Sequence, residues 1–139
     1  ILTDKALRCS LSEMQGALFE MSGTEGYDSE TFIRVFMRSK IAEGLDSDFD
    51  FTQWAGKEYI MERMKEEYPE GFSKNGIVFD SETLYWAGYL YRYWHFYTGE
   101  SSKDIYKQAN AQTVNTMYYG YHTLDIEMAI DRLKEAKKK

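Results

Sequence analysis

The segment from Leu84 to Tyr97 constrains the fold of this chain more than any other part of the sequence. Within it, only Arg92 and His95 carry charged or strongly polar side chains, and most of the remaining positions are aromatic or aliphatic. A helix that is apolar on all sides is buried in the middle of its domain or covered by a partner. We therefore predict a central aromatic helix in which Leu90 and Trp94 are deeply buried.

The rest of the chain repeats apolar residues at steps of three and four, as amphipathic helices do, and no long stretch alternates like a strand. This pattern predicts an all-α single domain, a compact bundle of six or seven short helices around the aromatic helix. Its expected parts are N-terminal helices within residues 4–68, a connector at 69–79, and the aromatic and C-terminal helices at 80–137. The expected N-terminal helices cover residues 4–22, 28–44 and 52–68, with a loop at 45–51.

Charge and composition exclude several classes of protein. The chain has 17 Lys and Arg against 23 Asp and Glu, a formal net charge of −6, and such a surface repels phosphate backbones. No apolar run approaches the roughly 18 residues that a membrane span needs. The single cysteine, Cys9, cannot form an internal disulfide, and we expect a buried, inert thiol. With no signal-peptide pattern at Ile1–Asp4, the expected location is the cytoplasm.

Motifs for metals, cofactors and catalysis are missing from the sequence. The two histidines, His95 and His122, do not have the spacing of a metal motif. The alternating aspartates at 46–50 resemble the start of a calcium loop, but Phe51 and Lys57 occupy the positions of the required Gly and Glu. No phosphate-binding glycine loop or nucleophile motif occurs either. We therefore predict no metal, no cofactor and no catalytic residues.

Residues 102–121 have the outline of a helix-turn-helix, which is an alternative function for this chain. The second helix would present Gln112, Asn115 and Thr116, whose side chains can contact base edges. However, that helix contains no Lys or Arg to bind phosphates and ends in tyrosines. These features disfavour nucleic-acid binding.

Arg92 and His95 lie three residues apart and would share one face of the aromatic helix. Two interpretations are open. Arg92 could form a salt bridge with a carboxylate inside the fold while His95 bonds a backbone carbonyl. Alternatively, the pair could line an aromatic pocket, with Tyr89 nearby, that binds a partner or that belongs to a small-molecule-binding protein or an enzyme.

The C-terminal part of the sequence has a recognisable order of motifs. The aromatic helix is followed by the turn Thr98-Gly99-Glu100-Ser101, a short helix, the block Tyr118–Thr123 and a closing helix with Met128-Ala129-Ile130-Asp131. In this order, residues 84–134 resemble small uncharacterised bacterial proteins encoded beside ADP-ribosyltransferase-like toxin genes. The resemblance implies an antitoxin or an accessory partner of such a toxin-like enzyme.

Taken with the aromatic content, this resemblance favours a non-catalytic protein-binding module. The chain has 12 Tyr, 8 Phe and 3 Trp, more than a core of this size is expected to enclose. Tyrosine and arginine are frequent at interface hot spots, and an acidic surface suits a basic partner. The predicted binding residues are Tyr89, Arg92, His95, Tyr118, Tyr119, Tyr121 and His122.

Overall fold

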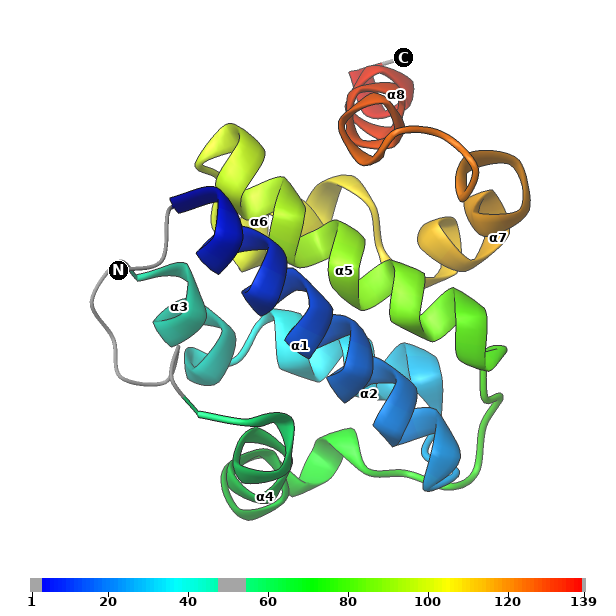
Figure 1. The fold of residues 1–139 in the computed structure, drawn as a ribbon. Helices are drawn as coiled ribbons and strands as arrows, with labels where there is room; N and C mark the ends of the chain where they lie inside the picture. The colour runs from blue at the N-terminus through cyan, green and yellow to red at the C-terminus, as the bar shows by residue number, and fades with distance from the viewer. Residues whose placement is uncertain (1–3, 48–54, 139) are drawn as a thin grey trace.

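In the computed structural model, which describes residues 4–47 and 55–138, the aromatic segment forms helix α5 (Ser81–Thr98). Helices from both halves of the chain pack against it, and α5 runs through the middle of the molecule (Figure 1). Leu90 and Trp94 are fully buried, as predicted. The helix ends at Gly99, whose φ of 81° is the left-handed conformation that glycine adopts without strain.

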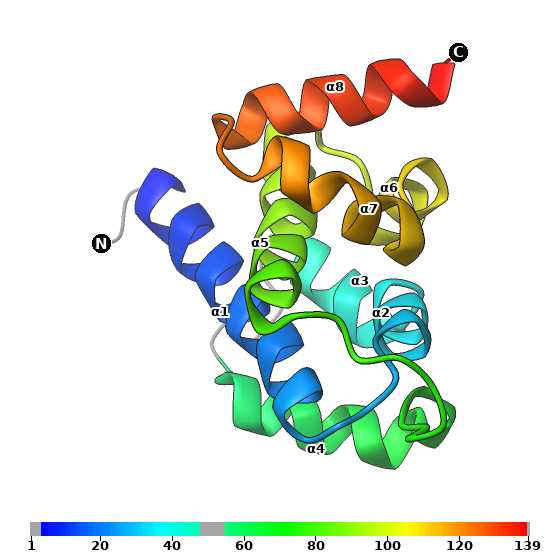
Figure 2. The same ribbon diagram turned by 90° about the vertical axis from the view of Figure 1, so that its right-hand side faces the viewer.

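The predicted all-α fold is confirmed, because the described ranges contain eight α-helices, one short 3₁₀ helix and no strand. The other elements are α1 (Asp4–Thr24), α2 (Ser29–Met37), α3 (Lys40–Asp46), α4 (Lys57–Glu67), η2 (Pro69–Gly71), α6 (Ser102–Gln108), α7 (Ala111–Tyr121) and α8 (Ile126–Lys138). Figure 2 shows α7 and α8 near one end of α5 and α4 on the opposite side of the molecule. No helix in the described ranges is both long and apolar enough to cross a bilayer.

The single helix predicted over residues 28–44 is wrong, because the structure divides it into α2 and α3. Ser39 causes the break: its Oγ accepts a hydrogen bond from the N–H of Ala42 at 3.1 Å and donates one to the carbonyl of Phe36 at 2.7 Å. A serine that caps a new helix in this way competes with continuation of the old one. The extra helix raises the count above the predicted six or seven, and it includes Leu45 and Asp46, which were expected in a loop.

The other predicted boundaries differ less. The N-terminal helix extends to Thr24 rather than residue 22. The next helix, predicted over 52–68, is shorter: α4 begins at Lys57 after the N-cap Gly56 and ends at Glu67. Thr52, its predicted cap, lies outside the described residues. Residues 72–79 contain no strand but are tied to α2, since Ser29 donates its backbone N–H to the carbonyl of Ile77 at 3.0 Å. This connector therefore returns the chain to the start of α5.

Helices α1 and α5 cross at unusually short range because each has a glycine at the contact. A Cβ placed on Gly88 would lie only 2.4 Å from the carbonyl oxygen of Gln15, and one on Gly16 would lie 2.8 Å from the carbonyl oxygen of Tyr85. Side chains at either position would push the two helices apart. The close crossing holds α1 along the central helix (Figure 1).

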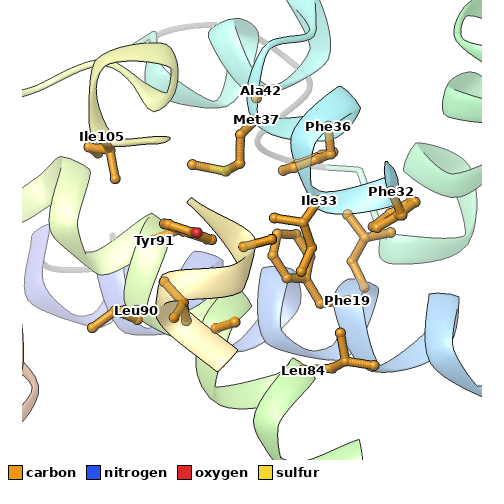
Figure 3. Packing of buried hydrophobic residues seen from close by; sticks show 14 of the residues in the cluster. Phe19, Phe32, Ile33, Phe36, Met37, Ala42, Leu84, Leu90, Tyr91 and Ile105 are labelled. Atoms are coloured by element: carbon orange, nitrogen blue, oxygen red, sulfur yellow. The ribbon is translucent and has the colours of Figure 1, made fainter. Parts of the chain in front are cut away.

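Aromatic rings fill the space between α1, α2 and α5. Phe19 packs edge-on against Phe36 with ring centroids 5.5 Å apart, and against Phe32 at 5.9 Å (Figure 3). Tyr91 lies beside Phe19 at 6.2 Å, and its hydroxyl donates to the carbonyl of Ala109 at 2.6 Å. The buried hydroxyl thus has a partner, as a phenol in an apolar core requires.

Candidate functional site

Arg92 is fully buried on α5 and is bonded within the fold through all three guanidinium nitrogens. Nη1 forms a 2.6 Å ion pair with Asp46 Oδ1, Nε donates to Gln15 Oε1 at 2.8 Å, and Nη2 donates to Ser102 Oγ at 3.2 Å. Burial lowers the pKa of Arg92, and the adjacent Asp46 carboxylate opposes that effect. We call these four residues the Arg92 cluster; it joins α1, α3, α5 and the start of α6.

Each partner in the Arg92 cluster has a further bond that fixes its position. Asp46 also accepts the backbone N–H and the hydroxyl of Ser102, both at 2.8 Å. Gln15 donates its amide to the carbonyl of Gly88 at 3.1 Å, at the glycine crossing of α1 and α5. A ligand that reached Arg92 would have to replace bonds that already hold these elements together.

His95 lies one turn from Arg92, and its ring is mostly buried. Its Nδ1 is 2.7 Å from the carbonyl oxygen of Glu100, and since a carbonyl only accepts, Nδ1 carries the hydrogen. The same nitrogen is 3.7 Å from Asp46 Oδ1. The first interpretation of this pair is therefore confirmed: Arg92 forms a salt bridge inside the fold, and His95 bonds a backbone carbonyl.

A second polar cluster, which the sequence analysis missed, surrounds Glu100 in the turn after α5. Its carboxylate accepts from Lys134 Nζ at 2.6 Å, Trp94 Nε1 at 2.9 Å and Gln108 Nε2 at 2.6 Å. Partial burial acts to raise the pKa of Glu100, but these hydrogen bonds outweigh it and lower the pKa to about 2. We call this the Glu100 cluster, and it joins α5, α6 and α8.

Tyr89, predicted as a binding residue, is the first of three tyrosines along one face of α5, the α5 tyrosine row (Tyr89, Tyr93 and Tyr97). The rings of Tyr89 and Tyr93 stack with centroids 6.1 Å apart and an interplanar angle of 10°. Burial, followed by the neighbouring Cys9, raises the pKa of Tyr89 to about 12. Cys9, expected to be buried, is only half-buried there.

Carboxylates of α8 face the other two tyrosines of this row. Tyr93 donates its hydroxyl to Glu127 at 2.9 Å, and Tyr97 donates to Asp131 at 3.0 Å. Burial and then the hydrogen bond to Glu127 raise the pKa of Tyr93, while the hydrogen bond to Asp131 is the main cause that raises the pKa of Tyr97. The row thus combines phenol rings with negative charge.

The four remaining predicted residues lie at the end of α7, and the structure separates them. Tyr119 is 88% exposed, whereas Tyr121 is half-buried against the core. Tyr118 stacks on His122 with centroids 4.4 Å apart, and its hydroxyl lies 3.4 Å from Glu82 Oε2. We call Tyr118, Tyr119 and His122 the α7 aromatic surface.

The α7 aromatic surface has a fixed shape despite its exposure. Trp86 of α5 packs edge-on against Tyr118 at 5.6 Å, and His122 Nδ1 is 2.8 Å from the carbonyl oxygen of Tyr118. Tyr119 alone projects without a ring partner in the described part of the chain. The α7–α8 turn then leads to Asp125, whose negative charge helps to raise the pKa of Tyr93 and Tyr97.

The sequence outline of a helix-turn-helix corresponds to α6, a short turn and α7. Gln112 and Thr116 are exposed, Asn115 is half-buried, and the nearby cations, Lys103 and Lys107, are on α6. Across residues 4–47 and 55–138, no group of three or more His, Cys, Asp or Glu side chains is arranged to hold a metal ion. Asp48 and Asp50, two of the alternating aspartates, lie outside those ranges, and Asp46 is the ion-pair partner of Arg92.

No protein-family model, curated protein or solved structure matches this chain. The candidate site therefore depends on the geometry of the chain itself. That geometry places Arg92 and His95 in the interior. The α7 aromatic surface packs on α5 through Trp86, and the α5 tyrosine row faces carboxylates of α8.

Proposed function

We propose that this protein is a non-catalytic binding module that contacts another protein through the α7 aromatic surface and the adjoining α5 tyrosine row. The observation that carries the proposal is the 88% exposure of Tyr119 next to the stacked pair of Tyr118 and His122. A large phenol ring held on a rigid helix loses little conformational entropy when a partner covers it. Such rings commonly dominate binding energy.

Charge supports a basic partner for this surface. Tyrosine rings of the proposed contact lie beside four carboxylates, those of Glu82, Asp125, Glu127 and Asp131. Carboxylates next to aromatic faces attract Lys and Arg both by charge and by cation–π contact. We therefore expect fast association at low ionic strength that slows as salt is added.

The resemblance of residues 84–134 to proteins encoded beside toxin-like genes supplies a candidate for the partner. The proposal is that this chain binds the product of an adjacent toxin-like gene in the bacterial cytoplasm, as an antitoxin or accessory subunit. The single cysteine is compatible with that reducing compartment.

Co-expression with the products of neighbouring genes, followed by co-purification and measurement of Kd, tests this proposal. Tyr119→Ala should weaken the complex about thirtyfold or more, as expected for a hot spot worth about 2 kcal/mol. The same variant should leave the melting temperature unchanged, because the ring is not packed in the fold. Ile77→Ala, at a 75% exposed apolar side chain on the connector, is the matched control and should bind like the parent.

Asp125→Asn probes the charge contribution separately. Asn can still cap α8, where Asp125 Oδ1 accepts the N–H of Glu127 at 2.9 Å, so the fold is retained. We expect a slower association rate and a weaker dependence on salt. The proposal fails if no neighbouring product co-purifies, or if Tyr119→Ala binds as tightly as the parent and Ile77→Ala.

A further inference from the structure

A hollow of about 510 Å³ lies between the end of α2 and the exposed face of α6. The described residues that line it are Arg38, Lys103, Tyr106 and Lys107. Helices α2 and α6 contact each other, and Figure 2 shows both on the same side of α5. None of these residues belongs to the proposed partner contact, so the hollow is a separate feature of the molecule.

The charge of this hollow is opposite to that of the protein as a whole. Three cations line it in a chain whose formal net charge is −6, and no carboxylate is among its described lining residues. Lys103 and Lys107 are one helical turn apart on α6, a spacing at which like charges repel. Arg38 lines the same hollow and adds to that repulsion, which a bound anion would relieve.

The three cations of the hollow differ in whether an ion pair holds them. In the described part of the chain, Arg38 and Lys103 form no ion pair, whereas Lys107 lies 3.7 Å from Asp104. Both side chains of that pair are more than 60% exposed, at 78% and 63%, so the pair is weak and readily exchanged. One turn before Arg38, Arg34 is 4.0 Å from Glu30. The positive groups therefore outnumber the negative ones around the hollow.

Tyr106 gives the hollow a fixed aromatic wall. Its ring contacts the buried Tyr91 with centroids 6.3 Å apart, which fixes its position against the core. Its hydroxyl oxygen accepts the backbone N–H of Ala111 at 3.3 Å, so the phenol proton is available for donation. Burial raises the pKa of the Tyr106 hydroxyl above its ordinary value.

We propose that this hollow binds a small phosphate-bearing anion. Guanidinium, two ammonium groups and a phenol O–H are donors suited to several phosphate oxygens at once, and their combined charge matches a di- or triphosphate. The volume falls within the range of small-molecule sites and suits a ligand of nucleotide size. The flat ring of Tyr106 supplies a surface for a base or sugar.

Titration of the full chain with inorganic pyrophosphate and, separately, with ADP, followed by isothermal calorimetry at low salt, tests this inference. Saturable binding of one equivalent is expected. Arg38→Gln and Lys103→Gln should each weaken binding about tenfold, because each removes a charge-assisted hydrogen bond. Both side chains are exposed, so both variants should keep the parent melting temperature.

Arg132→Gln is the matched control, since it removes one exposed positive charge from α8 that is not among the lining residues of the hollow. It should change Kd less than twofold. Tighter binding of ADP than of pyrophosphate would identify a nucleotide ligand, and equal binding would identify the phosphate groups as the recognised part. The inference is overturned if neither probe saturates, if Arg132→Gln weakens binding as much as Arg38→Gln, or if an oligonucleotide binds more tightly than both probes.

Discussion

Removal of the Asp46 carboxylate is the sharpest test of how α5 is held in place. Asp46 neutralises Arg92, which has no exposure to solvent, and it also accepts two hydrogen bonds from Ser102. Breaking a buried ion pair from one side leaves an uncompensated charge and typically costs about 3–5 kcal/mol. The expected loss is therefore a large part of the roughly 5–15 kcal/mol that stabilises a domain of this kind.

Removal of Arg92 should destabilise the protein less than removal of the Asp46 carboxylate. Replacing Arg92 with Met removes the fully buried charge, while Asp46, whose side chain is 11% exposed, keeps its bonds to Ser102 and its proximity to His95. We expect Arg92→Met to cost about 1–3 kcal/mol, less than Asp46→Ala. The double variant should then be more stable than Asp46→Ala alone, because it has no unpaired guanidinium.

Urea unfolding followed by circular dichroism gives the three free energies from the midpoints and m-values. Glu43→Ala is the matched control: it removes an exposed carboxylate from the same helix, α3, and should change stability by less than about 0.5 kcal/mol. A cost for Asp46→Ala below about 1 kcal/mol would refute the reasoning. So would a double variant that is less stable than Asp46→Ala.

Four further substitutions test the packing and the Glu100 cluster. Trp94→Ala should lower the free energy of unfolding by roughly 3–5 kcal/mol in urea denaturation, and a loss below about 1 kcal/mol would contradict its burial. Gly88→Ala should destabilise the protein by about 2 kcal/mol or more, because the new Cβ would meet the carbonyl oxygen of Gln15. Gly120→Ala, which has open space around it, is the control and should stabilise α7 by about 0.5–1 kcal/mol. Equal effects of the two substitutions would exclude the close crossing of α1 and α5. The pKa of Glu100 is about 2 in the folded protein, compared with its usual 4.5. Glu100 should therefore add up to about 3 kcal/mol to the free energy of unfolding above pH 4.5, and this stability should be lost as the pH falls toward 2. Glu100→Gln should remove that part of the acid sensitivity in unfolding curves at pH 7 and pH 3, and unchanged acid sensitivity would contradict the assignment.

The burial of Leu90 and Trp94 could be predicted from the sequence because a helix that is apolar all round has only one place in a helical domain. The partners of Arg92 could not, since Asp46 and Gln15 are 46 and 77 residues away in sequence. The available signal was Gln15, a polar residue at helical spacing between Leu11 and Leu18 in the first helix. It identifies a side chain that needs an internal partner but not which one.

The end of α7 shows a different limit of prediction from the sequence, namely which side chains are exposed. Tyr119 and Tyr121 looked equivalent in the sequence, yet one is exposed and the other is half-buried. The difference follows from helix phase: Val114 is buried, and Tyr121, seven residues later, returns to the same face. Tyr119 then points away. The break at Ser39 was harder to predict, because the sequence lacks the Glu at the third helical position that would complete a capping box there.

The two polar clusters meet at α6, and this arrangement connects the interior of the protein to its surface. Asp46 holds the start of α6 through Ser102, and Glu100 holds its end through Gln108. Lys103 and Lys107, which line the basic hollow, lie on the outer side of the same helix. Replacing a whole buried ion pair by apolar packing often costs little stability, whereas removing one partner breaks the contact between the elements that the pair joins. We therefore expect Asp46→Ala, under conditions where it remains folded, to weaken pyrophosphate binding in the hollow although Asp46 does not line it. Unaltered pyrophosphate affinity in the folded variant would show that α6 keeps its position without the Arg92 cluster.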